Sequence, residues 1–132
     1  FSLDVGARAI EIRRKLIRAL HEAGAGILLG SDAPQIFNVP GFSLHRELDL
    51  LVAAGLAPYD ALVAGTRAAG EFLGTNAGIV AVGREADLLL LDANPLVDIG
   101  NSRRIHGVML RGNWLSAAEL DRRLAAYRTA DR

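Results

Sequence analysis

A three-residue apolar run, residues 27–29, narrows the choice of fold more than any other feature of this sequence. An amphipathic helix is expected before it, over 8–23, and Gly30-Ser31 ends the run directly before Asp32. In a parallel α/β fold, an acid at the carboxyl end of a strand lies on the face where active sites collect. The same residues also fit an ordinary turn, because Ser and Asp side chains bond to nearby backbone groups. Asp32 is therefore the first candidate for a functional residue.

The composition is that of a globular protein without a charge bias. The 132 residues are 51% hydrophobic and 23% charged, which suits one domain with a core. Fifteen basic residues balance fifteen acidic ones, so the bulk charge favours neither nucleic acid nor an anionic membrane as a partner. The absence of cysteine excludes disulfides and thiolate metal ligands and fits a cytoplasmic protein. No apolar run approaches the roughly 20 residues that a membrane span needs.

Helix signals dominate the first half of the chain and strand signals the second half. Besides the first helix, we expect a loop over 33–43, helices over 44–54 and 58–73, strands over 88–91 and 105–110, and a last helix after the capping-box pattern Ser116 to Glu119. Arg111–Trp114 has the composition of a hairpin turn, and Asp87 is expected to anchor a turn or an edge of the sheet. Trp114 is expected to pack the last helix onto this sheet.

A lone strand between helices cannot form a sheet, so residues 26–29 need neighbouring strands that this chain does not obviously supply. Six motifs then follow one another over about residues 20–115. They are Ala-Gly-x-x-Ile-Leu-Leu-Gly-Ser-Asp at 23–32, Leu-His-Arg-Glu-Leu at 44–48 with its continuation at 51–62, and the segments 66–74, 78–88, 94–99 and 108–112. In this order the sequence resembles the amidohydrolase superfamily, most of all its imidazolonepropionase-like and dipeptidase-like branch.

The resemblance implies an α/β fold: the C-terminal part of a metal-dependent (β/α)8 hydrolase barrel plus part of a small accessory β-domain. Residues 1–74 would be the barrel portion, 75–115 strands of the β-domain and 116–132 a C-terminal helix. Asp32 matches the acid after the eighth strand, which in the family binds the metal and takes a proton from the attacking water. The implied reaction is hydrolysis of a C–N bond in an amide, a cyclic amide or a peptide.

The resemblance also implies a divalent metal, zinc as one or two ions, whose other ligands lie upstream of this chain. The three histidines, His21, His45 and His106, do not have the spacing of metal ligands. The chain opens on Phe1 and its only methionine is Met109, so we expect further residues upstream. A full barrel needs roughly 200 to 250 residues. The fragment alone is therefore expected to be inactive.

Four further polar residues near Asp32 each have two interpretations. His45 follows Asp32 by thirteen residues and is either a substrate contact or a polar residue at a helix start that faces solvent. Gln35, Asn38 and Arg46 are either substrate contacts or ordinary exposed residues of the loop and the helix that follows it.

Two other functions stay open at this stage. One is a metal-free structural or assembly member of the same superfamily, and the other is an independent small α/β binding domain. In the preferred interpretation the partner is a small-molecule amide or dipeptide substrate, without nucleic acid or membrane. Homo-oligomer formation is left open.

Overall fold

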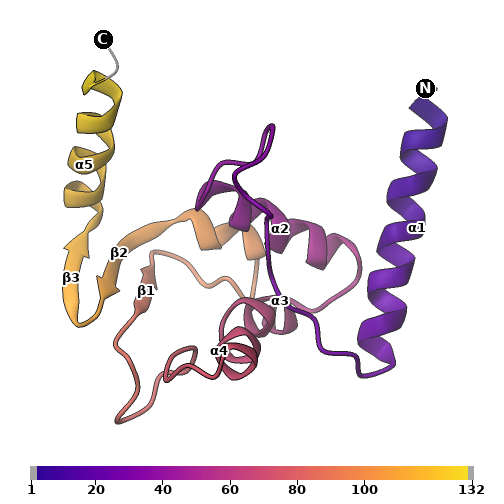
Figure 1. Ribbon diagram of the computed structural model, residues 1–132, viewed down its shortest axis with the longest axis horizontal. Coiled ribbons are helices and arrows are strands. Elements are labelled where there is room, and N and C mark those ends of the chain that lie inside the picture. Colours follow the sequence, from indigo (N-terminus) through magenta and orange to yellow (C-terminus); the bar gives the residue numbers. More distant parts are fainter. Residues whose placement is uncertain (1–2, 131–132) are drawn as a thin grey trace.

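The computed structural model describes residues 3–130. Four helices come first: α1 (Leu3–Glu22), α2 (Phe42–Ala53), α3 (Pro58–Gly65) and α4 (Arg67–Leu73). They are followed by β1 (Leu88–Leu91), the 3-10 helix η1 (Ile99–Arg103), β2 (Ile105–Leu110), β3 (Asn113–Ser116) and α5 (Ala117–Ala130). Helices α1 and α5 stand at opposite ends of the molecule, and the remaining elements lie between them (Figure 1).

The core is small and lies between α2, α3 and η1. Its buried side chains are Leu48, Leu51, Leu56, Ala61, Ala64 and Ile99. Ile17 of α1, and Ile27 and Leu29 of the segment after α1, pack against this cluster. Much apolar surface stays uncovered, since Leu16 of α1 is 58% exposed and Phe72 of α4 is 75% exposed. The described residues therefore bury only one contiguous cluster.

The sheet has three antiparallel strands in the order β1-β2-β3. A two-residue turn, Arg111-Gly112, joins β2 to β3, and both residues have positive φ (49° and 79°), which matches the twist of a tight hairpin. Asp87 anchors this turn as predicted, because its Oδ1 accepts a hydrogen bond from the Arg111 backbone N–H at 2.6 Å. Ser116 Oγ accepts from the Glu119 N–H at 3.3 Å, which is the predicted cap of α5.

Residues 27–29 do not form a strand, so that prediction is wrong for this chain. In the described part of the chain no strand lies beside them, and a single bond from the Leu29 N–H to the Ala64 carbonyl, at 3.1 Å, ties them to the end of α3. A strand needs a partner for its backbone donors and acceptors. Ile79, Val80 and Val82 are β-branched, but they also lie outside the sheet.

The helix expected over 58–73 is two helices. Thr66 separates α3 from α4 with φ −126° and ψ −94°, outside helical space. Its hydroxyl donates to the Leu62 carbonyl at 2.7 Å, a local bond that competes with the helical pattern. The expectation of one continuous helix is therefore corrected at Thr66.

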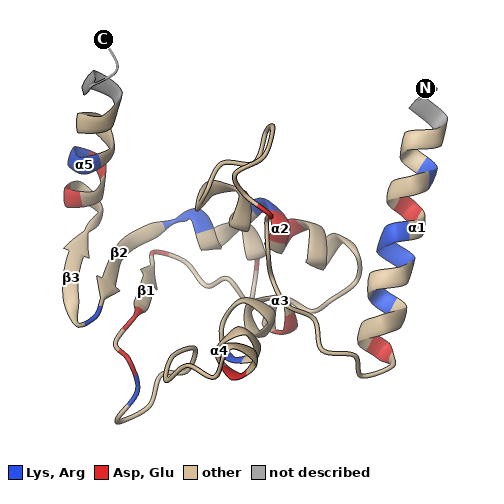
Figure 2. Ribbon diagram, in the orientation of Figure 1, with Lys and Arg blue, Asp and Glu red and all other residues tan. Residues whose placement is uncertain are grey.

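The architecture is mixed α/β with a small antiparallel sheet, and no parallel barrel strands occur within residues 3–130. None of the described helices is both long and apolar enough to span a bilayer. Acidic and basic side chains are interspersed along α1 (Figure 2), where Lys15 pairs with Glu11 and Arg18 with Glu22. These two pairs engage Lys15 and Arg18, whereas basic residues outnumber acidic ones along α1.

Candidate active site

Asp32 lies at the start of a loop, residues 31–41, that we call the Asp32 loop. The segment before it is fixed by Ile27 and Leu29, which pack against the core, and by the Leu29 bond to α3. The fit is close at Gly65, where an added Cβ would lie 2.6 Å from Leu29 Cδ2. Asp32 itself is exposed and has a positive φ of 53°. The core thus holds the chain up to the residue that bears the candidate carboxylate.

The Asp32 loop is closed by its own polar side chains. Gln35 Nε2 donates to Asp32 Oδ2 at 2.5 Å. Asn38 Nδ2 donates to the Ser31 carbonyl at 2.9 Å, and the Asn38 N–H donates to the Gln35 carbonyl at 2.9 Å. At the far end, the Val39 N–H donates to Ser43 Oγ at 2.8 Å, which attaches the loop to α2. Two of the suggested substrate contacts, Gln35 and Asn38, therefore have partners inside the loop.

His45 lies on α2 and does not simply face solvent. Its Nδ1 is 3.0 Å from Ser102 Oγ of η1, and Ser102 is only 2% exposed. Burial lowers the pKa of the His45 imidazole below its usual value; the nearby Arg103 guanidinium lowers it too, whereas the Asp49 carboxylate opposes the shift. His45 is therefore held as a neutral ring near pH 7, since an ordinary histidine has a pKa of about 6.5.

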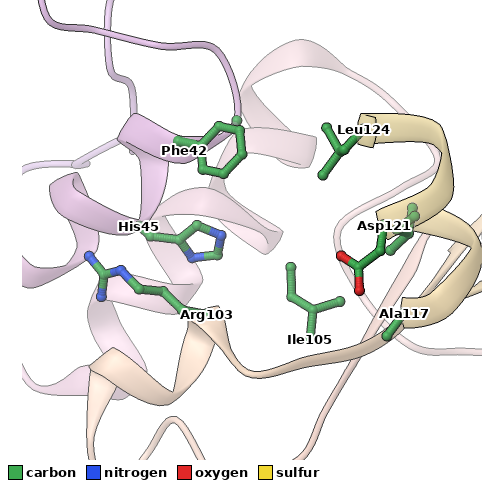
Figure 3. A pocket seen from close by; sticks show the side chains of 9 residues that line it. Phe42, His45, Arg103, Ile105, Ala117, Asp121 and Leu124 are labelled. Atoms are coloured by element: carbon green, nitrogen blue, oxygen red, sulfur yellow. The ribbon is translucent and has the colours of Figure 1, made fainter. Parts of the chain in front are cut away.

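A cavity of about 420 Å³ adjoins His45 (Figure 3). Phe42 and His45 of α2 form one side, and Leu124 and Asp121 of α5 face them across Ile105. Arg103 also lines the cavity, but its guanidinium is paired with both carboxylate oxygens of Asp49, at 2.6 and 3.3 Å. Asp32 does not line this cavity. The structure therefore places the two predicted site residues in different surroundings.

The His45–Ser102 pair was not predictable from the sequence, because 57 residues separate its members. The Gln35–Asp32 bond had a weak signal, namely two polar side chains three residues apart around a proline. Arg46, the remaining suggested contact, lies exposed on α2.

Asp32 fits the part of one metal ligand. Oδ2 is occupied by the Gln35 amide, and Oδ1 has no hydrogen bond within the described residues, so one oxygen is available to an ion. A catalytic zinc takes three protein ligands and keeps an open position. Within residues 3–130 no three His, Cys, Asp or Glu side chains come together in a way that could hold an ion. Any such ion therefore needs ligands from outside the described residues.

Comparisons with known proteins agree on one family. The model of the amidohydrolase family matches residues 7–115. A proposed prolidase from Bifidobacterium longum, known from its crystal structure, is 38% identical to this chain with a TM-score of 0.70. Molinate hydrolase is 27% identical with a TM-score of 0.61. An Xaa-Pro dipeptidase, at 22% identity and a TM-score of 0.69, shows likeness of fold alone.

The chain is shorter than each of these proteins. It matches over 83% of its own length but 29% of the proposed prolidase, and over 75% of its length but 25% of molinate hydrolase. The Xaa-Pro dipeptidase match covers 79% of this chain and 25% of that protein. No protein of curated function matches the chain.

Proposed function

Because the chain belongs to the amidohydrolase family, we propose that it is the C-terminal segment of a metal-dependent hydrolase that cleaves C–N bonds. The observation that supports this most is the position of Asp32, on a closed loop at the end of a segment held by the core, with one carboxylate oxygen available. In this proposal residues 1–74 belong to the barrel, 75–115 to the accessory β-domain and 116–132 to a C-terminal helix.

The proposed chemistry uses Asp32 twice. Its carboxylate accepts a proton from the attacking water and later gives that proton to the leaving nitrogen, so one residue serves both steps of amide hydrolysis. A divalent ion, when bound, lowers the pKa of its water to about 7. Asp32 would supply one ligand through Oδ1. The remaining ligands, zinc as the metal, and a count of one or two ions are parts of the same proposal.

We infer a small amide or dipeptide as the substrate. The 38% identity to a proposed prolidase makes a dipeptide ending in proline the first compound to test. His45 is assigned a secondary part in substrate binding, because it lies on α2, which follows the Asp32 loop, and Ser102 holds its Nδ1. Its ring faces the cavity of Figure 3, which Asp32 does not line, so the proposed contact is to a part of the substrate away from the bond that is cleaved. Nε2 is the ring atom that remains for a polar group of the substrate.

The test uses the full-length protein that contains this chain, loaded with zinc and assayed on a series of Xaa-Pro dipeptides and simple amides. Asp32→Asn keeps the size of the side chain and its hydrogen bonding but removes the basic oxygen. We expect turnover to fall by about 10²- to 10⁴-fold, the usual contribution of a positioned acid or base, with an unchanged circular dichroism spectrum. Turnover within twofold of the unaltered protein would exclude Asp32 as the general base.

A further inference from the structure

We propose that Gln35 is a positioning residue that holds one carboxylate oxygen of Asp32, Oδ2, so that Oδ1 is the oxygen presented to the reacting groups. This inference rests on the proposed function of Asp32 and adds to it a residue and an assignment of the two oxygens. The Gln35 amide nitrogen lies 2.5 Å from Asp32 Oδ2. No other hydrogen bond to the Asp32 carboxylate occurs among the described residues.

The Gln35 amide is itself held in place. Gln35 and Asn38 form an isolated antiparallel bridge, and the Asn38 N–H donates to the Gln35 carbonyl at 2.9 Å. The Asn38 side chain reaches back to the Ser31 carbonyl at 2.9 Å. Ser31, Asp32, Gln35 and Asn38 thus close a ring of bonds around the candidate acid. A long side chain loses rotamer entropy when it is fixed, and a backbone that is already ordered limits the further cost.

The backbone at Asp32 supports the same arrangement. Its φ of 53° is a left-handed conformation that few non-glycine residues adopt, although Asp is among the more tolerant. Such conformations persist only where surrounding contacts determine them, and they gather at active sites. The bonds from Gln35 to the Asp32 carboxylate and from Asn38 to the Ser31 carbonyl are contacts of this kind.

Holding Oδ2 has a chemical consequence. A free carboxylate turns about its Cβ–Cγ bond and can present either oxygen, whereas a carboxylate bonded through Oδ2 presents Oδ1 in one direction. Ligands and bases gain from such a fixed direction, because misplacement by about 1 Å costs about 10²-fold in rate. Loss of a residue that orients a ligand typically costs about 10- to 100-fold in metal affinity or in activity. Gln35 is expected to have an effect of this size.

The experiment compares Gln35→Met, which keeps the length of the side chain without its donor, with Val39→Ala in the full-length protein. Val39 belongs to the same loop and its side chain is 54% exposed, so its truncation is the matched control. The readouts are kcat and KM on Ala-Pro, zinc affinity by competition with a chelator, and the midpoint of thermal unfolding. Zinc affinity is included because it does not depend on the choice of substrate.

For Gln35→Met we expect kcat to fall about 10- to 100-fold, zinc affinity to fall about tenfold, and KM and the unfolding midpoint to stay near those of Val39→Ala. Gln35→Ala should show the same order of effects. The inference is wrong if Gln35→Met matches Val39→Ala in kcat and zinc affinity while Asp32→Asn has lost turnover, and in that case the proposed function stands. It is also wrong if only KM and the midpoint change, since Gln35 would then merely shape the loop. Wild-type turnover and zinc affinity in Asp32→Asn would instead refute the proposed function itself.

Discussion

His45 lines the candidate cavity and also contacts the buried residue Ser102 of η1. Its Nδ1 meets the buried hydroxyl of Ser102, so the bond that satisfies Ser102 also orients the ring. Arg103 and Asp49 lie close enough to act on its charge, and Asp121 lines the same cavity from α5. Protonation of His45 therefore places a charge in a half-buried position beside a guanidinium.

This arrangement predicts a pH dependence of stability. The folded protein lowers the pKa of His45, so between that lowered pKa and the ordinary value of about 6.5 the unfolded chain binds more protons. The free energy of unfolding then rises with pH across this interval. The loss of stability that comes from protonating His45 is complete below it. We expect the full-length protein to unfold at a lower temperature at about pH 5.5 than at about pH 7.5, on either side of that ordinary pKa.

The comparison that isolates His45 is the variant His45→Gln, which keeps a polar partner for Ser102 but does not titrate. His21 and His106 remain in both proteins, so their contributions cancel in the difference. We expect the difference in unfolding temperature between the two pH values to be smaller in His45→Gln than in the unaltered protein, as measured by calorimetry. An equal difference in unfolding temperature in both proteins would show that His45 does not contribute to the pH dependence of stability.

Residue roles were predictable from the sequence where they depend on near neighbours along the chain. The cap at Ser116 and Glu119 follows from three-residue spacing. The identity of Asp87 as a turn anchor was also predictable, although its partner, Arg111, lies 24 residues away. The Ser102 partner of His45 was not, because only the packing of η1 against α2 brings the two together.

The close packing of β2 against β3 in their hairpin depends on one residue without a side chain, Gly107. Trp114 of β3 covers Gly107 of β2 so closely that an added Cβ would lie 2.2 Å from the indole ring and 2.9 Å from the Leu115 carbonyl. The packing of Trp114 against the last helix stays a prediction, and the structure adds its contact with Gly107 of β2. Gly107 therefore makes room for the largest side chain of the sheet.

This contact predicts that Gly107→Ala destabilises the sheet. The ring must leave its position or the strands must separate, and such overpacking typically costs about 1–3 kcal/mol in the free energy of unfolding. Val97→Ala is the control, because Val97 lies in the turn before η1 and is 81% exposed. Urea unfolding of the full-length protein measures both. If the two variants have the same midpoint, Trp114 does not require the glycine.

Helices and the hairpin were predictable from local pattern, whereas the strand expected over 27–29 does not form, because a strand needs a partner for its backbone groups. Helix α2 forms where apolar residues recur at helical spacing, and it buries Leu48 and Leu51 as that spacing indicates. Residues 27–29 carry an equally clear apolar pattern, but their one bond to a neighbouring element is that of Leu29 to Ala64. Strand pairing needs at least two segments, so an apolar run without a neighbouring strand does not form one.

Many apolar side chains are exposed on the surface that the structure describes. Helix α1 stands at one end of the molecule with Ile10 and Leu16 at least half exposed (Figure 1). Phe72 is 75% exposed and Val80 86% exposed at other places on the surface. Scattered apolar residues are ordinary on a protein surface, but contiguous patches usually meet another protein surface. This distribution is what a segment spanning 29% of a relative's length would show.

The last prediction concerns residues 1–132 produced alone. Because the helix faces and the segment at 27–29 lack their neighbours in the proposed barrel, we expect the isolated chain to associate and to bind a hydrophobic dye, and the full-length protein not to bind the dye. Sedimentation velocity over a rising concentration series measures the association. A monomer at every concentration, with one cooperative unfolding transition, would instead favour an independent small binding domain, because a chain that needs no further surface to fold is a complete unit.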